Sequence, residues 1–218
     1  MAGQTRDRQQ IIQGMYKLYF RNIHPTLSSM KNIIPLPALL ILSIVTTSFS
    51  HMEKKVHVGD WAPFEDAGCR MLFPKTPEKE SQTVNTAIGE MKLYTYTYEV
   101  PDSVEDDNLV YTLSETEFSD SSNINSNSSK EKIDKFFRGV VDGGVKSTQA
   151  KLLTEEIVQL DGFPGRKFRA DVKDGLAIMT MIAYLVKNKM YMLQVLTETK
   201  KDLNKSINKF MDSFKLKY

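Results

Sequence analysis

The sequence predicts an α+β domain in which an antiparallel sheet is sandwiched between helices, an α/β/α arrangement. Residues 176–186 and 190–197 are apolar at almost every position, which is typical of strands that are buried on both faces. Two segments with helical spacing of apolar residues, one after Ser128 and one near the C-terminus, can supply the covers. The predicted domain spans residues 60–218.

Residues 30–50 have the pattern of a secretory signal peptide. Lys31 supplies a positive charge, 33–45 is an apolar run, and Ser48 and Ser50 occupy the small-residue positions of a cleavage site. The apolar run is shorter than the roughly 20 residues that span a bilayer. We therefore expect cleavage, with no stable membrane span afterwards, although an uncleaved anchor is the alternative.

Residues 1–29 precede this signal and are expected to lie upstream of the true start at Met30. The alternative is a basic, acidic-poor organellar presequence. Residues 51–59 are expected to be a flexible arm. On this interpretation the product is exported and is periplasmic or extracellular.

The composition argues against several classes of function. The first fifty residues hold five of the 29 basic residues and one of the 27 acidic ones, so the rest has a net charge of about −2. That balance predicts no nucleic-acid partner. His51 and His57 both lie in the arm, so we expect no histidine triad and no His-rich metal site in the domain. No residue spacing singles out another metal site or a cofactor site, and we expect neither. Cys69 is the only cysteine and is expected to be a small buried side chain.

The first half of the domain is predicted to be strands. Pro74 ends a strand over 69–73, 80–87 is weakly strand-like, and 101–108 is an acidic loop between strands over 91–100 and 109–118. The loop lacks the glycine and spacing of a calcium site, so a solvated loop is favoured.

Three tyrosines share one face of the strand over 91–100, namely Tyr94, Tyr96 and Tyr98. Such a stripe is either a ligand-facing surface or, more commonly, half-buried sheet surface beneath a helix with its hydroxyls at the edge. We name these tyrosines as candidate binding residues.

Local signals set the predicted helix ends. Ser128 and Glu131 have the spacing of a capping box, and Gly143-Gly144 is expected to stop the first helix. Apolar residues at helical spacing predict the second helix: Leu203, Ile207, Phe210, Met211 and Phe214.

The segment 161–165 is predicted to be a tight turn after a strand over 152–160. The next strand, 166–172, alternates like an edge strand. Asp161, Arg166 and Arg169 are candidate contacts for an anion or a carboxylate, although the two arginines could simply keep an edge strand soluble.

Four short motifs resemble PsbP-like domains, in particular the exported, uncharacterised bacterial members of that superfamily. They are Phe73-Pro74, the Gly-Phe-Pro-Gly-Arg turn 162–166, Met-Tyr-Met-Leu at 190–193 and Phe-Met-Asp-Ser-Phe-Lys-Leu at 210–216. The likeness covers about residues 60–218. It implies an α/β/α sandwich, and the photosystem extrinsic subunit and nuclear-import factor of that superfamily act by binding proteins.

These observations favour a non-catalytic, exported binding or accessory domain whose partner is an unknown protein or small ligand. One alternative is a hydrolase that uses two facing carboxylates, since the domain is rich in acidic residues. The other is a structural or assembly protein of the cell envelope, which an exposed apolar patch would favour.

Overall fold

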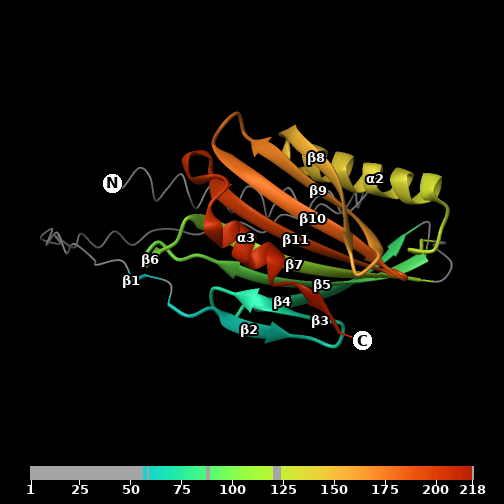
Figure 1. Cartoon of the computed structure of the whole chain (residues 1–218), viewed down its shortest axis with the longest axis horizontal. Coiled ribbons are helices and arrows are strands. Elements are labelled where there is room, and N and C mark those ends of the chain that lie inside the picture. Colours follow the sequence, from blue (N-terminus) through green and yellow to red (C-terminus); the bar gives the residue numbers. More distant parts are fainter. Residues whose placement is uncertain (1–55, 58, 87–88, 120–123, 218) are drawn as a thin grey trace, which may run out of the picture.

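The computed structural model describes residues 56–57, 59–86, 89–119 and 124–217 (Figure 1). The predicted N-terminal extension and the predicted signal peptide both lie outside the described residues. Within the predicted arm, β1 (Val56–His57) pairs in parallel with β6 (Val104–Glu105). No helix in the described part of the chain is long and apolar enough to cross a membrane.

A seven-stranded antiparallel sheet forms the centre of the molecule, in the order β4-β5-β7-β11-β10-β9-β8. Every strand predicted over residues 80–197 is present. The strands are β4 (Glu78–Thr86), β5 (Gly89–Glu99), β7 (Asn108–Phe118), β8 (Ala150–Leu160), β9 (Phe163–Val172), β10 (Ala177–Val186) and β11 (Lys189–Glu198).

The inner strands are buried on both faces, as predicted. Nine of the ten residues of β10 are buried, and most of β11 is buried too. Along β10, Met181 packs in a cluster on one face and Ile182 packs in a second cluster on the other. The sheet therefore separates two apolar cores, each of which needs its own cover.

The first cover is α2 (Lys130–Thr148), which packs on β8 and β9. Ser129, not Ser128, is the N-cap, and its hydroxyl accepts from the amide of Lys132. The predicted capping box is therefore wrong by one residue. Gly143-Gly144 does not end the helix, which continues to Thr148. Its C-cap is Gln149, which has the left-handed conformation (φ 53°).

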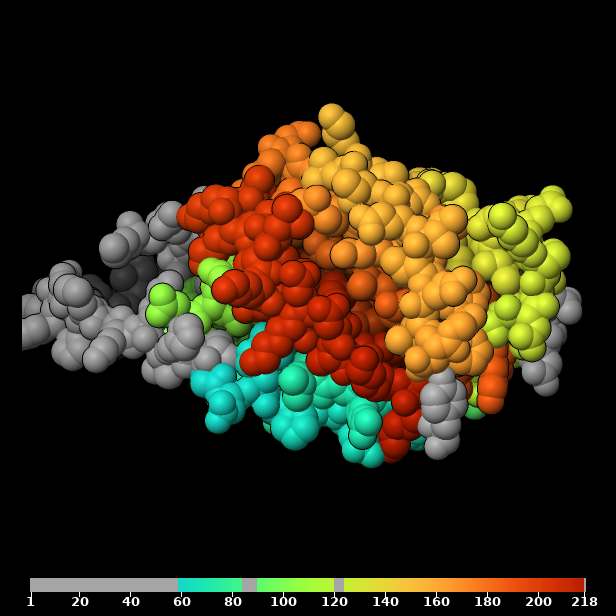
Figure 2. Space-filling view, in the orientation of Figure 1, coloured from blue at the N-terminus to red at the C-terminus, as the bar shows by residue number. Residues whose placement is uncertain are grey.

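The second cover differs from the prediction of a helix alone. α3 (Lys205–Asp212) shares that face with a three-stranded sheet in the order β12-β3-β2, and η2 (Thr199–Lys201) leads toward it. The small sheet consists of β2 (Ala62–Glu65), β3 (Cys69–Phe73) and β12 (Lys215–Leu216). In Figure 2 the C-terminal residues, in red, lie between the cyan β2–β3 region and the orange β8–β9 region.

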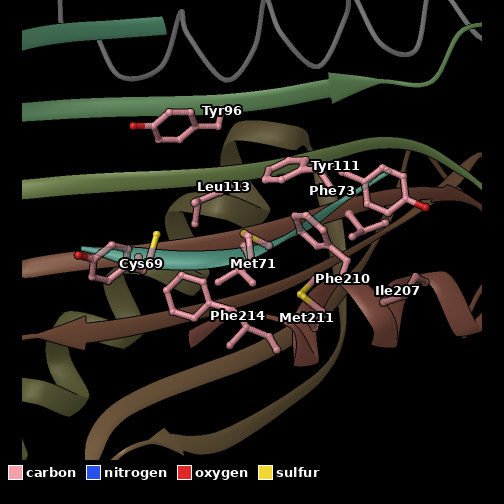
Figure 3. Packing of buried hydrophobic residues seen from close by; sticks show 14 of the residues in the cluster. Cys69, Met71, Phe73, Tyr96, Tyr111, Leu113, Ile207, Phe210, Met211 and Phe214 are labelled. Carbon is pink, nitrogen blue, oxygen red and sulfur yellow. The ribbon is translucent and has the colours of Figure 1, made fainter. Parts of the chain in front are cut away.

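Aromatic rings join α3 to this small sheet and to the central sheet (Figure 3). The Phe210 ring lies 5.1 Å from that of Phe73 and 5.2 Å from that of Tyr111, between ring centroids. Leu203 was predicted to lie on the same helix, but it precedes α3, has a positive φ of 58° and is 70% exposed. Leu203 therefore does not belong to the buried apolar face of α3.

The turn between β8 and β9 consists of two residues and is shorter than the predicted turn over 161–165. Asp161 and Gly162 have φ of 50° and 84°, whereas Phe163 already belongs to β9. Gly165 lies inside β9, where an added Cβ would stand 2.6 Å from the Tyr184 ring and 2.8 Å from the Ala183 carbonyl oxygen. The glycine therefore makes room for an aromatic ring rather than for a bend.

Candidate functional site

An apolar groove lies along one flank of α2, between this helix and the part of the sheet that the helix does not cover. Its volume is about 710 Å³, within the roughly 300–1,000 Å³ of small-molecule sites. We call it the α2 groove. Strand residues line its floor: Met91, Leu93, Thr116, Phe118, Met181, Met190 and Met192. Helix residues line its wall: Phe136, Gly139, Val140, Gly143, Gly144, Lys146 and Ser147.

Strand register brings the floor residues together. Leu93 on β5 is opposite Thr116 on β7, which in turn is opposite Met190 on β11. Side chains opposite each other in antiparallel strands lie on the same face of the sheet. Three strands, one of them far from the other two in the sequence, therefore contribute side chains to one row across the floor of the groove.

Glycines in α2 leave the wall of the groove without side chains at two positions. Gly139 and Gly143 are exposed within α2, and a Cβ added at either would meet no atom within 4 Å. Gly144 differs, because its Cβ would lie 3.1 Å from the Phe168 ring. Each helix-interior glycine costs about 1 kcal/mol relative to alanine. Packing explains that cost at Gly144, whereas at the other two positions the glycine only keeps the groove open.

Ion pairs hold α2 on the flank opposite the groove. Arg166 of β9 reaches Asp134 at 3.2 Å, and Arg138 reaches Glu155 of β8 at 2.6 Å. The Arg166 guanidinium also lies 5.7 Å from the centroid of the Phe137 ring. These contacts hold α2 over β8 and β9. The position of the helix in turn defines the groove along its opposite flank.

Among the described residues that line the groove, one is charged, Lys146, and none is a carboxylate. Lys146 is exposed and makes no ion pair with any other residue that the structure describes. Thr116 and Ser147 are the uncharged polar lining residues, and the Ser147 hydroxyl donates to the Gly144 carbonyl at 3.1 Å. The groove is thus apolar along its length, with a single positive group.

The candidate residues Asp161, Arg166 and Arg169 do not form one surface. Arg166 faces α2, whereas Arg169 donates to Asp202 on the opposite face of the sheet. Asp161 is exposed at the β8–β9 turn. The prediction of an edge strand was wrong, because β9 lies between β8 and β10. Keeping an edge soluble therefore does not account for the arginines, which anchor neighbouring elements.

The tyrosine stripe lies against the small sheet. Tyr96 is buried, its ring centroid is 4.6 Å from that of Phe64 in β2, and its hydroxyl donates to Asp66. Tyr94 and Tyr98 are half-buried on the same face. This matches the half-buried interpretation, with strands rather than a helix as the main cover. None of the six candidate binding residues lines the α2 groove.

Carboxylates near the small sheet are neutralised locally. Glu115 on β7 is buried and accepts from Lys189 at 2.6 Å. Cys69 lies in the same region, and burial followed by the nearby Glu115 and Asp66 carboxylates raises its pKa to about 12. Among the described residues there is no group of three or more His, Cys, Asp and Glu side chains suited to a metal ion.

Sequence reasoning did not find the α2 groove. The available signals were methionines clustered in the strands and two glycines in the wall helix, Gly139 and Gly143. Glycines near a helix end ordinarily signal its termination, and methionine runs ordinarily signal core. Only strand register and helix placement show that these residues meet across an open space.

No protein-family description matches the chain, and no curated protein matches it. One solved structure to which it is similar is the solution structure of PsbP (CyanoP) from the cyanobacterium Synechocystis sp. PCC 6803. The two share 14% sequence identity with a TM-score of 0.38, over 79% of this chain and 98% of that one. That likeness is too low to transfer a fold or a function, so the PsbP-like resemblance stays a prediction.

Proposed function

We propose that the chain is an exported, non-catalytic binding domain that holds an apolar ligand in the α2 groove. The observation that carries this proposal is the groove itself: a volume of about 710 Å³, an apolar floor and a wall kept low by glycines. A monomeric soluble domain ordinarily fills or covers such a surface, so an open one points to binding.

No carboxylate is found in the part of the groove lining that the structure describes, which supports a binding role over the carboxylate-pair hydrolase. General acid and base catalysis requires a titratable group within hydrogen-bond reach of the substrate. Lys146 is the only titratable side chain among the described residues that line the groove, so they do not supply the two facing carboxylates that such a hydrolase requires.

Export rests on the signal pattern of residues 30–50. When the full chain is expressed with a C-terminal tag in a secretion-competent bacterium, the product should be recovered outside the cytoplasm. N-terminal sequencing should find a start near residue 51. A product that retains residues 30–50 at a membrane, or that stays in the cytoplasm, would contradict this part of the proposal.

Binding is tested with N-phenyl-1-naphthylamine, an uncharged dye whose fluorescence rises in apolar surroundings. The full wild-type chain should bind the dye saturably. Gly143→Leu should weaken binding at least tenfold, because the new side chain enters open space at the wall. The variant should stay folded and gain up to about 1 kcal/mol of stability, since leucine is the better helix former.

Lys135→Leu is the matched control, because it adds the same side chain at an exposed position of α2 that does not line the groove. It should leave dye binding unchanged. Equal binding by the wild type and Gly143→Leu would mean that the dye binds elsewhere. In that case the groove would lose its assigned role.

A further inference from the structure

We propose that the ligand of the α2 groove is a free long-chain carboxylate, with its chain along the methionine floor and its carboxylate at Lys146. This inference rests on the proposed function and adds the chemical class of the ligand. Three features carry it: the nature of the floor, the glycines of the wall and the sign of the single charge.

The floor suits a flexible chain better than a rigid ring system. Four methionines line the groove, at positions 91, 181, 190 and 192. Methionine is unbranched and has three rotatable bonds, so such a surface adapts its shape to an apolar chain of varying conformation. Thr116 and Ser147 are too few polar partners to orient a sugar or a nucleotide base.

The wall leaves room at the helix backbone. Gly139 and Gly143 are four residues apart, so they lie on the same side of α2, one turn above the other. Each leaves open space where a Cβ would project. Methylene groups of a ligand can therefore approach the helix backbone closely along more than a turn.

The charge favours an anion. Among the described residues, Lys146 is the only charged side chain of the lining, and it has no ion-pair partner there. It lies in the last turn of α2. Two of the three acidic side chains of the same helix, Asp134 and Asp142, are paired with arginines on the other flank, and the third, Glu131, lies in the first turn. A single ammonium group matches one carboxylate, whereas phosphate sites commonly use the forked guanidinium of arginine.

Competition with the bound dye tests the inference in the full chain. Octanoate, decanoate and dodecanoate are titrated below the concentrations at which they form micelles. Each added pair of methylenes should tighten binding by roughly tenfold, as expected for burial of an alkyl chain. Dodecanoate should also bind about fivefold more tightly than dodecanol, the size expected of an exposed ion pair.

Lys146→Gln should abolish the preference for dodecanoate over dodecanol and leave dodecanol binding unchanged. Lys132→Gln is the control, because Lys132 lies in the first turn of α2 and does not line the groove. It should retain the preference. Equal preference in the wild type and Lys146→Gln would overturn the assignment of the carboxylate to Lys146.

The remaining outcomes separate this inference from the proposed function. Dye binding that is lost in Gly143→Leu but is never displaced by dodecanoate would overturn the inference and leave the binding role intact. No dye binding by the wild type would overturn both. Cosedimentation with phosphatidylglycerol vesicles, without binding of free dodecanoate, would replace the free carboxylate by a membrane surface and would also overturn the inference.

Discussion

Replacing Phe210 by alanine should lower the free energy of unfolding by roughly 3–5 kcal/mol, the usual cost of removing a buried aromatic ring. Phe210 is fully buried and makes edge contacts with Phe73 and Tyr111. It thus joins α3, the small sheet and the central sheet. The loss is a large part of the roughly 5–15 kcal/mol that stabilises an ordinary domain.

The single tryptophan, Trp61, reports directly on this region, because its ring lies 5.5 Å from that of Tyr111. Its fluorescence during urea unfolding gives the midpoint and slope for each variant. Asn208→Ala, at an exposed position of α3, should change the unfolding free energy by less than about 0.5 kcal/mol. A loss below 1 kcal/mol for Phe210→Ala would show that α3 is not part of the cooperative core.

Cys69 should react with a thiol reagent at pH 8 about a thousandfold more slowly in the folded chain than in urea. Its pKa is raised from 9.0 to about 12 by burial and by the nearby carboxylates of Glu115 and Asp66. The thiolate is the reactive form, so a shift of this size removes about three powers of ten from its concentration. Burial of the sulfur slows the reaction further.

The same shift makes stability depend on pH. The neutral thiol is favoured in the folded chain, so above pH 9 the unfolded chain loses this proton first and stability falls. The slope approaches about 1.4 kcal/mol per pH unit. Cys69→Ala should remove close to one proton's worth of slope between pH 10 and pH 11, where the thiol is largely ionised in the unfolded chain and largely neutral in the folded one. Identical slopes in the wild type and the variant would rule out a strongly raised pKa at Cys69.

The sheet could be predicted because its signals are local. The two-sided apolarity of 176–186 and 190–197 has one common physical cause, burial on both faces, and the structure has β10 and β11 in the interior of the sheet. The turn at Asp174-Gly175 is equally local, since Asp-Gly is a common hairpin sequence and Gly175 has a φ of 92°. Each of these features depends on neighbours within a few residues.

The glycines of α2 show why other predictions were wrong. Glycine serves equally to end a helix, to admit a neighbouring ring or to leave a surface open, and all three are consistent with Gly-Gly in the sequence. Gly144 approaches Phe168, which is 24 positions further along the chain, and Gly143 faces the α2 groove. Nothing local distinguishes these uses.

The strand β3 is a related case. It was predicted from Cys69–Phe73. One of its partners, β2, directly precedes it in the chain, but the other, β12, comes from the C-terminal end of the domain. Their pairing places a second sheet beside α3, where the sequence predicted a helix as the only cover. Partners that are distant in the chain meet through shape and burial, which short-range patterns do not encode.

Periodicity and two-sided apolarity by themselves determined the seven strands of the central sheet, the existence of both helices and the presence of two cores, because burial acts on each residue through its own side chain. The tertiary structure alone decided the order of the strands, the sharing of one face by α3 and a small sheet, and the separation of Arg166 from Arg169. The α2 groove also depends on the tertiary structure alone, because a groove is the space between elements that are distant in the sequence and exists only once they are packed.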